Sequence, residues 1–70
     1  MIPLCFAQID EVNVIKKITG NPEVKKHLED MGFVTGAVIS VVSCIDGNLI
    51  VNVKDTKVAL DKQLAMKIMI

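Results

Sequence analysis

The sequence predicts a mainly β fold: a small five-stranded barrel with one short α-helix inserted between the first and second strands. Three observations favour this fold. Five short segments alternate apolar and polar residues or are rich in β-branched residues, and turn residues separate them. A single stretch repeats its apolar residues at helical spacing. The chain has only 70 residues, and closure into a barrel lets so short a chain protect its strand edges.

The first expected strand covers residues 11–18, where apolar and polar side chains alternate. Lys16 interrupts one of the two faces, which indicates an edge strand or a twisted strand. Alternation divides the other side chains between one face with Val12, Val14 and Ile18 and a second face with Asn13, Ile15 and Lys17.

Residues 21–32 carry the start and stop signals of a short helix. Asn21 is a suitable N-cap, and Pro22 is favoured at the first helical position. Gly32 can adopt the left-handed conformation that ends a helix. Between these residues one apolar stripe consists of Val24, Leu28 and Met31.

The rest of the chain predicts a meander of four strands. The pair Asp46-Gly47 between two β-rich runs is a strong hairpin signal, and a second turn is expected at Asp55-Thr56. A single 3₁₀ turn is expected at residues 61–64. The four expected strands cover residues 37–42, 49–54, 57–60 and 66–70.

Charge and aromatic content argue against a nucleic-acid partner. Eight lysines balance eight acidic residues, and the chain contains no arginine, although nucleic-acid-binding proteins carry a basic excess in which arginine contacts bases and phosphates. Phe6 and Phe33 are the only aromatic residues, too few for a base-stacking platform. A chain of this length is expected to form one domain, residues 1–70.

Hydropathy and cysteine usage predict a cytoplasmic protein with no direct membrane insertion. The longest uncharged run, residues 31–45, has fifteen residues, fewer than the roughly 20 that span a bilayer as a helix. The N-terminal residues lack the basic region of a signal peptide. Cys5 and Cys44 form no Cys-x-x-Cys pair, so we expect two reduced, buried cysteines that act as small apolar side chains.

An ordered set of glycine and apolar positions extends over nearly the whole chain. It contains Leu28-x-x-Met31-Gly32-Phe33-x-x-Gly36, Val38-x-x-Val41, Gly47, Val51-x-Val53, Val58-Ala59-Leu60, Ala65 and Ile68. This set resembles the FeoA family. The resemblance implies an SH3-like barrel and a small cytoplasmic protein that is accessory to the bacterial ferrous iron transporter FeoB.

Two positions depart from the family pattern. The family tends to have glycine in the turn before the first strand and again near residue 55, where this chain has Asp10 and Asp55. Aspartate tolerates left-handed turn conformations, so we expect the fold to be retained. A related module occurs at the C-terminus of some metal-dependent repressors, but this chain has no DNA-binding helix-turn-helix.

No residue pattern predicts an enzyme, a cofactor or a metal centre. Catalysis needs a nucleophile, a base and an orienting group in one pocket, and the only histidine is His27, on the expected helix. No glycine-rich phosphate loop precedes a helix. Together with His27, Cys5 and Cys44 are metal ligands by type, but they lack the close pairs that usually mark a site.

A protein-interaction role remains, and the expected helix suggests its surface. A cleft between the helix and the barrel would have an apolar centre and a charged rim, which is the usual anatomy of an interface. We expect this surface to dock on the cytoplasmic side of an FeoB-like membrane transporter and to modulate its assembly or activity. The candidate partner-binding residues are Lys25, Lys26, Leu28, Glu29, Met31, Phe33 and Val34.

Three alternatives stay open. Leu28, Met31 and Phe33 could instead be residues of the hydrophobic core. The domain could instead be a metal-sensing or regulatory SH3-like module that binds Fe(II) or another divalent metal. It could also act by self-association, since an exposed edge strand at residues 66–70 would support strand addition.

Overall fold

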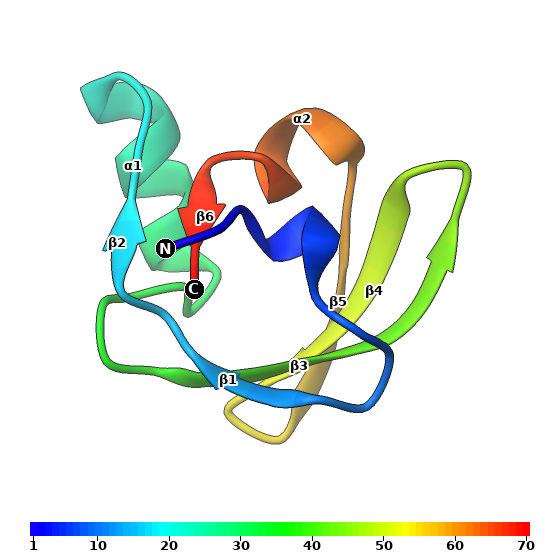
Figure 1. Cartoon of the computed structure of the whole chain (residues 1–70). Helices are drawn as coiled ribbons and strands as arrows, with labels where there is room; N and C mark the ends of the chain where they lie inside the picture. The colour runs from blue at the N-terminus through cyan, green and yellow to red at the C-terminus, as the bar shows by residue number, and fades with distance from the viewer.

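Six strands in two antiparallel sheets surround one apolar core in the computed structural model, which describes residues 1–70 (Figure 1). The larger sheet has the order β1-β3-β4-β5 and the smaller one pairs β2 with β6. The prediction of a mainly β fold is confirmed. The elements in chain order are η1 (Leu4–Phe6), β1 (Val12–Val14), β2 (Lys17–Ile18), α1 (Pro22–Asp30), β3 (Val38–Ile45), β4 (Asn48–Val53), β5 (Thr56–Leu60), α2 (Lys62–Ala65) and β6 (Ile68–Met69).

The expected first strand is divided into two strands of different sheets. Ile15 donates its backbone N–H to the carbonyl of Ala37 beside β3 (2.9 Å), whereas Lys16 donates to Met69 in β6 (2.8 Å). The chain therefore leaves the large sheet and enters the small one between these two residues. This crossing raises the number of strands from the five predicted to six, and α1 follows the second half of the divided strand.

The alternation predicted for this strand holds in its first half and fails in its second. Ile15 is 1% exposed, whereas Val12 and Val14 are 69% and 48% exposed. Val12 and Val14 thus lie on the face opposite Ile15, as alternation predicts, but the change of sheet after Ile15 shifts the alternation, so that Ile18 enters the core with Ile15. The valines of β1 consequently lie on the outer face.

Helix α1 begins and ends where its capping residues predict. The side chain of Asn21 accepts a hydrogen bond from the N–H of Val24 (2.9 Å), which satisfies one of the free donors of the first turn. Gly32 has φ +99°, and Phe33 donates its N–H to the carbonyl of Leu28 (2.9 Å). This left-handed glycine returns the chain toward the barrel.

The expected 3₁₀ turn at residues 61–64 is instead a four-residue α-helix, α2. Asp61 caps it by accepting a hydrogen bond from the N–H of Leu64 (2.8 Å). The cap lets the first turn continue into i→i+4 bonds, such as the one from the N–H of Ala65 to the carbonyl of Asp61 (2.9 Å).

Two-residue turns join β3 to β4 and β4 to β5. Asp46 and Gly47, at φ 53° and 84°, form the first turn, and Lys54 and Asp55, at φ 50° and 60°, form the second. Both pairs have the signs of a type I′ turn, which matches the twist of adjacent strands. The hairpin at Asp46-Gly47 is confirmed, and the second turn lies one residue earlier than predicted.

The two departures from the family pattern have the expected backbone. Asp10 has φ 65° and Asp55 has φ 60°, so both aspartates occupy the left-handed region that glycine would otherwise supply.

Strand β6 is not the exposed edge that the self-association alternative requires. On one side Met69 pairs with Lys17 of β2. On the other side it forms a bridge with Pro3, and Ile2 and Ile70 exchange backbone hydrogen bonds of 3.0 and 2.8 Å. Figure 1 shows the two chain ends next to each other at this strand. Strand addition at residues 66–70 is therefore excluded, because N-terminal residues already occupy that position.

One cluster of fourteen residues forms the core. Every member is apolar, and no polar side chain is buried. The two cysteines are absent from this cluster: Cys5 is half-buried and Cys44 is exposed, and both are free. The prediction that both are buried is thus wrong. The core consists of Leu4, Ile15, Ile18, Leu28, Phe33, Ile39, Val41, Leu49, Val51, Val53, Leu60, Ala65, Ile68 and Ile70. No helix is long and apolar enough to cross a membrane.

Candidate functional site

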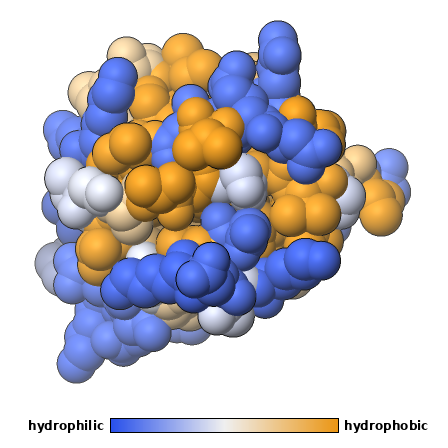
Figure 2. All heavy atoms as spheres, turned by 90° about the horizontal axis from the view of Figure 1, so that it is seen from below, coloured by the Kyte–Doolittle hydropathy of each residue, from blue (hydrophilic) through white to orange (hydrophobic).

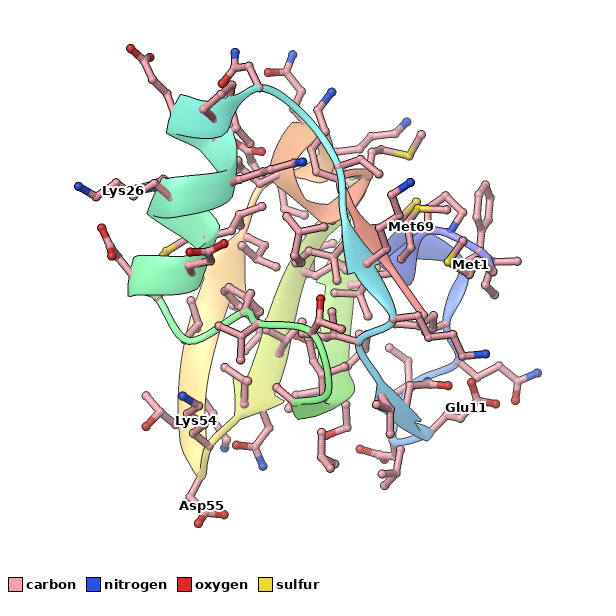
Figure 3. The ribbon with its side chains drawn as sticks, turned by 90° about the vertical axis from the view of Figure 1, so that its left-hand side faces the viewer. Met1, Glu11, Lys26, Lys54, Asp55 and Met69 are labelled. Atoms are coloured by element: carbon pink, nitrogen blue, oxygen red, sulfur yellow. The ribbon has the colours of Figure 1, made fainter.

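The outer face of α1 carries the charged residues of the predicted partner-binding set. Lys25, Lys26 and Glu29 are all exposed, because the helix turns Leu28 toward the core and its polar positions toward solvent. Figure 3 shows Lys26 extending from α1 away from the barrel. The cap at Asn21 and the reversal at Gly32 fix both ends of this face.

Two members of the predicted partner-binding set are not accessible to a partner. Leu28 and Phe33 are each 0% exposed, so they belong to the core. Met31 and Val34, at the C-terminal end of α1, are half-buried and reach the surface in part. The structure thus places five of the seven predicted residues on the surface: Lys25, Lys26, Glu29, Met31 and Val34.

The surface hollows lie elsewhere than at the predicted cleft between helix and barrel. One hollow of about 400 Å³ lies over β1, β3 and β4, where Val12, Val38, Asn52 and Lys54 are among its lining residues. A second, of about 370 Å³, lies between the β3–β4 hairpin and the end of β5. Helix α1 contributes no residue to either. A partner would therefore meet α1 as a convex surface.

The outer face of the large sheet is an apolar surface that the sequence reading missed. The register pairs Val14 with Val38, so these side chains and that of Val12 lie on the same face. All three are about half exposed or more. Figure 2 views the molecule from this side and shows apolar side chains gathered over the middle of the face, with hydrophilic side chains around and between them. Lys16 was the available signal, because alternation places this charged residue on the same face as Val12 and Val14.

The potential metal ligands are not brought together. The structure contains no group of three or more histidine, cysteine, aspartate or glutamate side chains that could hold an ion. His27 lies exposed on α1 and Cys44 lies exposed on β3. Cys5 points its Sγ to the Sδ of Met66 at 3.1 Å, which joins η1 to the end of α2.

Comparison with known proteins agrees with this architecture. The family model described as the FeoA domain matches residues 2–70. The chain is also 34% identical over 70 residues to a protein of Methanocaldococcus jannaschii named as an inferred Fe(2+) transport protein A. That alignment covers 100% of this chain and 85% of the relative.

Solved structures share the fold. A crystal structure of an iron uptake regulatory protein (FeoA) superposes with a TM-score of 0.89 at 28% identity, covering 97% of this chain and 90% of the other. The zinc complex of Stenotrophomonas maltophilia FeoA, described as a prokaryotic SH3 domain protein, has a TM-score of 0.84 at 21% identity and covers 99% and 88%. A manganese-dependent transcriptional repressor has a TM-score of 0.86 at 16% identity, and the match covers 94% of this chain but 38% of the repressor.

At these identities the zinc complex and the repressor inform the fold alone, which is SH3-like. The family model and the relative from Methanocaldococcus jannaschii both extend over essentially the whole chain. The chain belongs to the FeoA family.

Proposed function

We propose that this chain is a non-enzymatic accessory protein of ferrous iron uptake that docks on the cytoplasmic side of an FeoB-type, GTP-dependent transporter and modulates its assembly or activity. The observation that carries the proposal is membership of the FeoA family over residues 2–70. The relative named for Fe(2+) transport, which aligns over the full chain, supports the same role.

The proposed docking surface is the outer face of α1 with the turn that follows it. It presents the cations Lys25 and Lys26 and the anion Glu29 beside the partly exposed apolar side chains of Met31 and Val34. A charged rim beside a small apolar centre favours a moderate-affinity contact. Because α1 is anchored by Leu28 in the core, the partner would meet a surface with little freedom to lose on binding.

The test is a titration of the isotope-labelled chain with the soluble GTPase region of the transporter from the same organism. We expect amide shifts clustered on residues 25–34. A double charge reversal, Lys25→Glu with Glu29→Lys, should abolish them, because it inverts the rim without changing net charge. The matched control is Lys57→Glu on β5, an exposed lysine of a different element, which should leave the titration unchanged.

The outcomes separate the alternatives. Binding that survives the double reversal would mean that α1 is not the surface. An absence of shifts at high concentration would exclude direct docking on the GTPase region. Stoichiometric shifts around His27 on addition of Fe(II), with none on addition of the GTPase region, would favour the metal-sensing alternative.

A further inference from the structure

Strand β1 is an open edge of the large sheet. The sheet order places it at one end, with β3 as its only strand partner. No backbone hydrogen bond joins residues 12–14 to any segment other than β3. In Figure 1, β1 runs across the lower part of the molecule with β3 beside it.

The unpaired backbone groups of this edge can be identified. Ile15, opposite Ala37, donates its N–H to that residue (2.9 Å). Hydrogen-bonded pairs alternate along an antiparallel ladder, so Asn13 also faces β3, which leaves Val12 and Val14 facing outward. Each of these valines presents one N–H and one C=O to solvent, and their side chains are 69% and 48% exposed.

We propose that β1 pairs with β1 of a second copy of this chain, antiparallel and about a two-fold axis at Asn13. The pairing joins two four-stranded sheets into one sheet of eight strands. Val12 lies opposite Val14 of the second copy, and the reverse pair forms by symmetry. This proposal is independent of the docking role of α1.

The register follows from the four free groups. When Val12 faces Val14 of the second copy, each residue donates its N–H and accepts through its C=O, so all four free groups of each copy are satisfied. Pairing Val12 with Val12, or Val14 with Val14, would leave half of them without a partner. The matching side chains are apolar, and adjacent β-branched residues on one face favour each other.

Charge favours the antiparallel direction. Asp10 and Glu11 precede the strand, and Lys16 and Lys17 follow it. An antiparallel pair therefore brings the acidic end of one copy to the basic end of the other at both ends of the contact, with Asp10 opposite Lys16 of the second copy. A parallel pair would bring like charges together. With a net charge of zero, no long-range repulsion opposes association.

The contact is short, because β1 has three residues. We expect a weak dimer with a dissociation constant on the order of 10⁻⁴ M, at the low end of specific interfaces. Such a dimer forms at high local concentration and leaves α1 of each copy free, because the helix lies outside both the strand and its flanking residues.

The experiment measures sedimentation and amide shifts of the full chain up to about 2 mM at low salt, well above the expected dissociation constant. We expect concentration-dependent shifts centred on residues 12–14. In a sample that mixes labelled and unlabelled copies, an intermolecular contact between the Asn13 α-protons should appear. A strictly monomeric chain at this concentration, or shifts centred on β5 or α1, would overturn the proposal.

Two variants test the edge itself. Val12→Pro removes an outward-facing N–H without removing a bond to β3, a position where an edge strand tolerates proline, and it should abolish dimerisation. Lys16→Glu places two acidic residues opposite each other and should weaken the dimer about tenfold. Lys57→Glu is the matched control and should have no effect. Each variant is first checked for an amide spectrum with native dispersion, and a folded Val12→Pro that still dimerises would overturn the proposal.

Discussion

The two edges of the large sheet differ in length and in what they present. At β1, a three-residue strand, Val12 and Val14 direct both their backbone groups and their apolar side chains outward. At β5, a five-residue strand, Val53 and Thr56 close the two-residue turn as a pair, so alternation directs the backbone groups of Lys57 and Ala59 outward. An edge lysine hinders strand addition. The longer edge, β5, is therefore protected against strand addition by Lys57, whereas the shorter edge, β1, has no charged residue within the strand.

The largest predicted effects are losses of stability, and they should be equal at the two edges, because the core residues beneath both edges are equally buried. Ile15, just after β1, and Leu60, at the end of β5, are each 1% exposed. Replacing either with alanine should lower the free energy of unfolding by about 3 kcal/mol, through lost burial and a residual cavity. Urea denaturation followed by circular dichroism measures this. Val38→Ala, on the exposed face, is the control and should change stability by less than about 0.5 kcal/mol. A loss of stability in only one of these two alanine variants would mean that the two sides of the core differ.

Replacing Lys57, the lysine that protects the β5 edge, should make the two edges alike in their tendency to pair. In the Val12→Pro background, which is expected to be monomeric, Lys57→Val leaves an apolar edge strand without its charge, and we expect self-association centred on residues 56–60 to appear. Sedimentation as a function of concentration measures the change. Lys62→Val, on α2, is the control. If the Lys57 variant stays monomeric, the lysine is not what keeps this edge unpaired.

Substitutions in the turn that leads into β5 should be able to raise the free energy of unfolding. Lys54 and Asp55 both have positive φ, a conformation that costs most residues about 1 kcal/mol or more. Replacing the pair with Asn-Gly, through Lys54→Asn and Asp55→Gly, should raise the free energy of unfolding by about 1 kcal/mol. In the other turn Asp46→Asn should change little, since Gly47 already follows it. Equal gains in both turns would contradict the assignment of strain to Lys54 and Asp55.

The smallest effect separates the edges by their salt dependence. Association through β1 brings acidic and basic flanks together, so raising the salt concentration to about 0.5 M should weaken it roughly threefold by screening. Association through β5 in the Lys57→Val variant relies on backbone and apolar contacts and should change by less. Sedimentation at two salt concentrations makes the comparison. A larger effect of salt on association through β5 than on association through β1 would rule out the proposed pairing of Asp10 with Lys16.

Local signals predicted the parts of the fold that local interactions determine. Asn21 and Gly32 delimit the helix because a cap and a left-handed residue act within one turn. Asp46-Gly47 locates a hairpin for the same reason. The break after Ile15 could not be predicted in this way, because it depends on a hydrogen bond from Lys16 to Met69, a residue far along the chain.

The candidate site was predicted in part for a related reason. Helical periodicity separates the apolar stripe of α1 from its charged face, but it does not tell which apolar residues stay accessible once the barrel packs against them. Leu28 and Phe33 entered the core completely, while Met31 and Val34 did not. Alternation places Val12 and Val14 on the face opposite Ile15, but which of these two faces meets the core is determined by the tertiary structure.

The pairing of the two chain ends has a consequence for the order of folding. The turns between β3, β4 and β5 close over two residues each, so this meander can form early with little loss of chain entropy. The small sheet joins Ile18 to Ile68, fifty residues apart, and the pair Ile2–Ile70 joins the ends of the chain. We expect these strands to be the last to assemble. The amide of Ile70, held by Ile2, should then exchange with solvent sooner than the amides of β4, and it would serve as an early indicator that the barrel is opening.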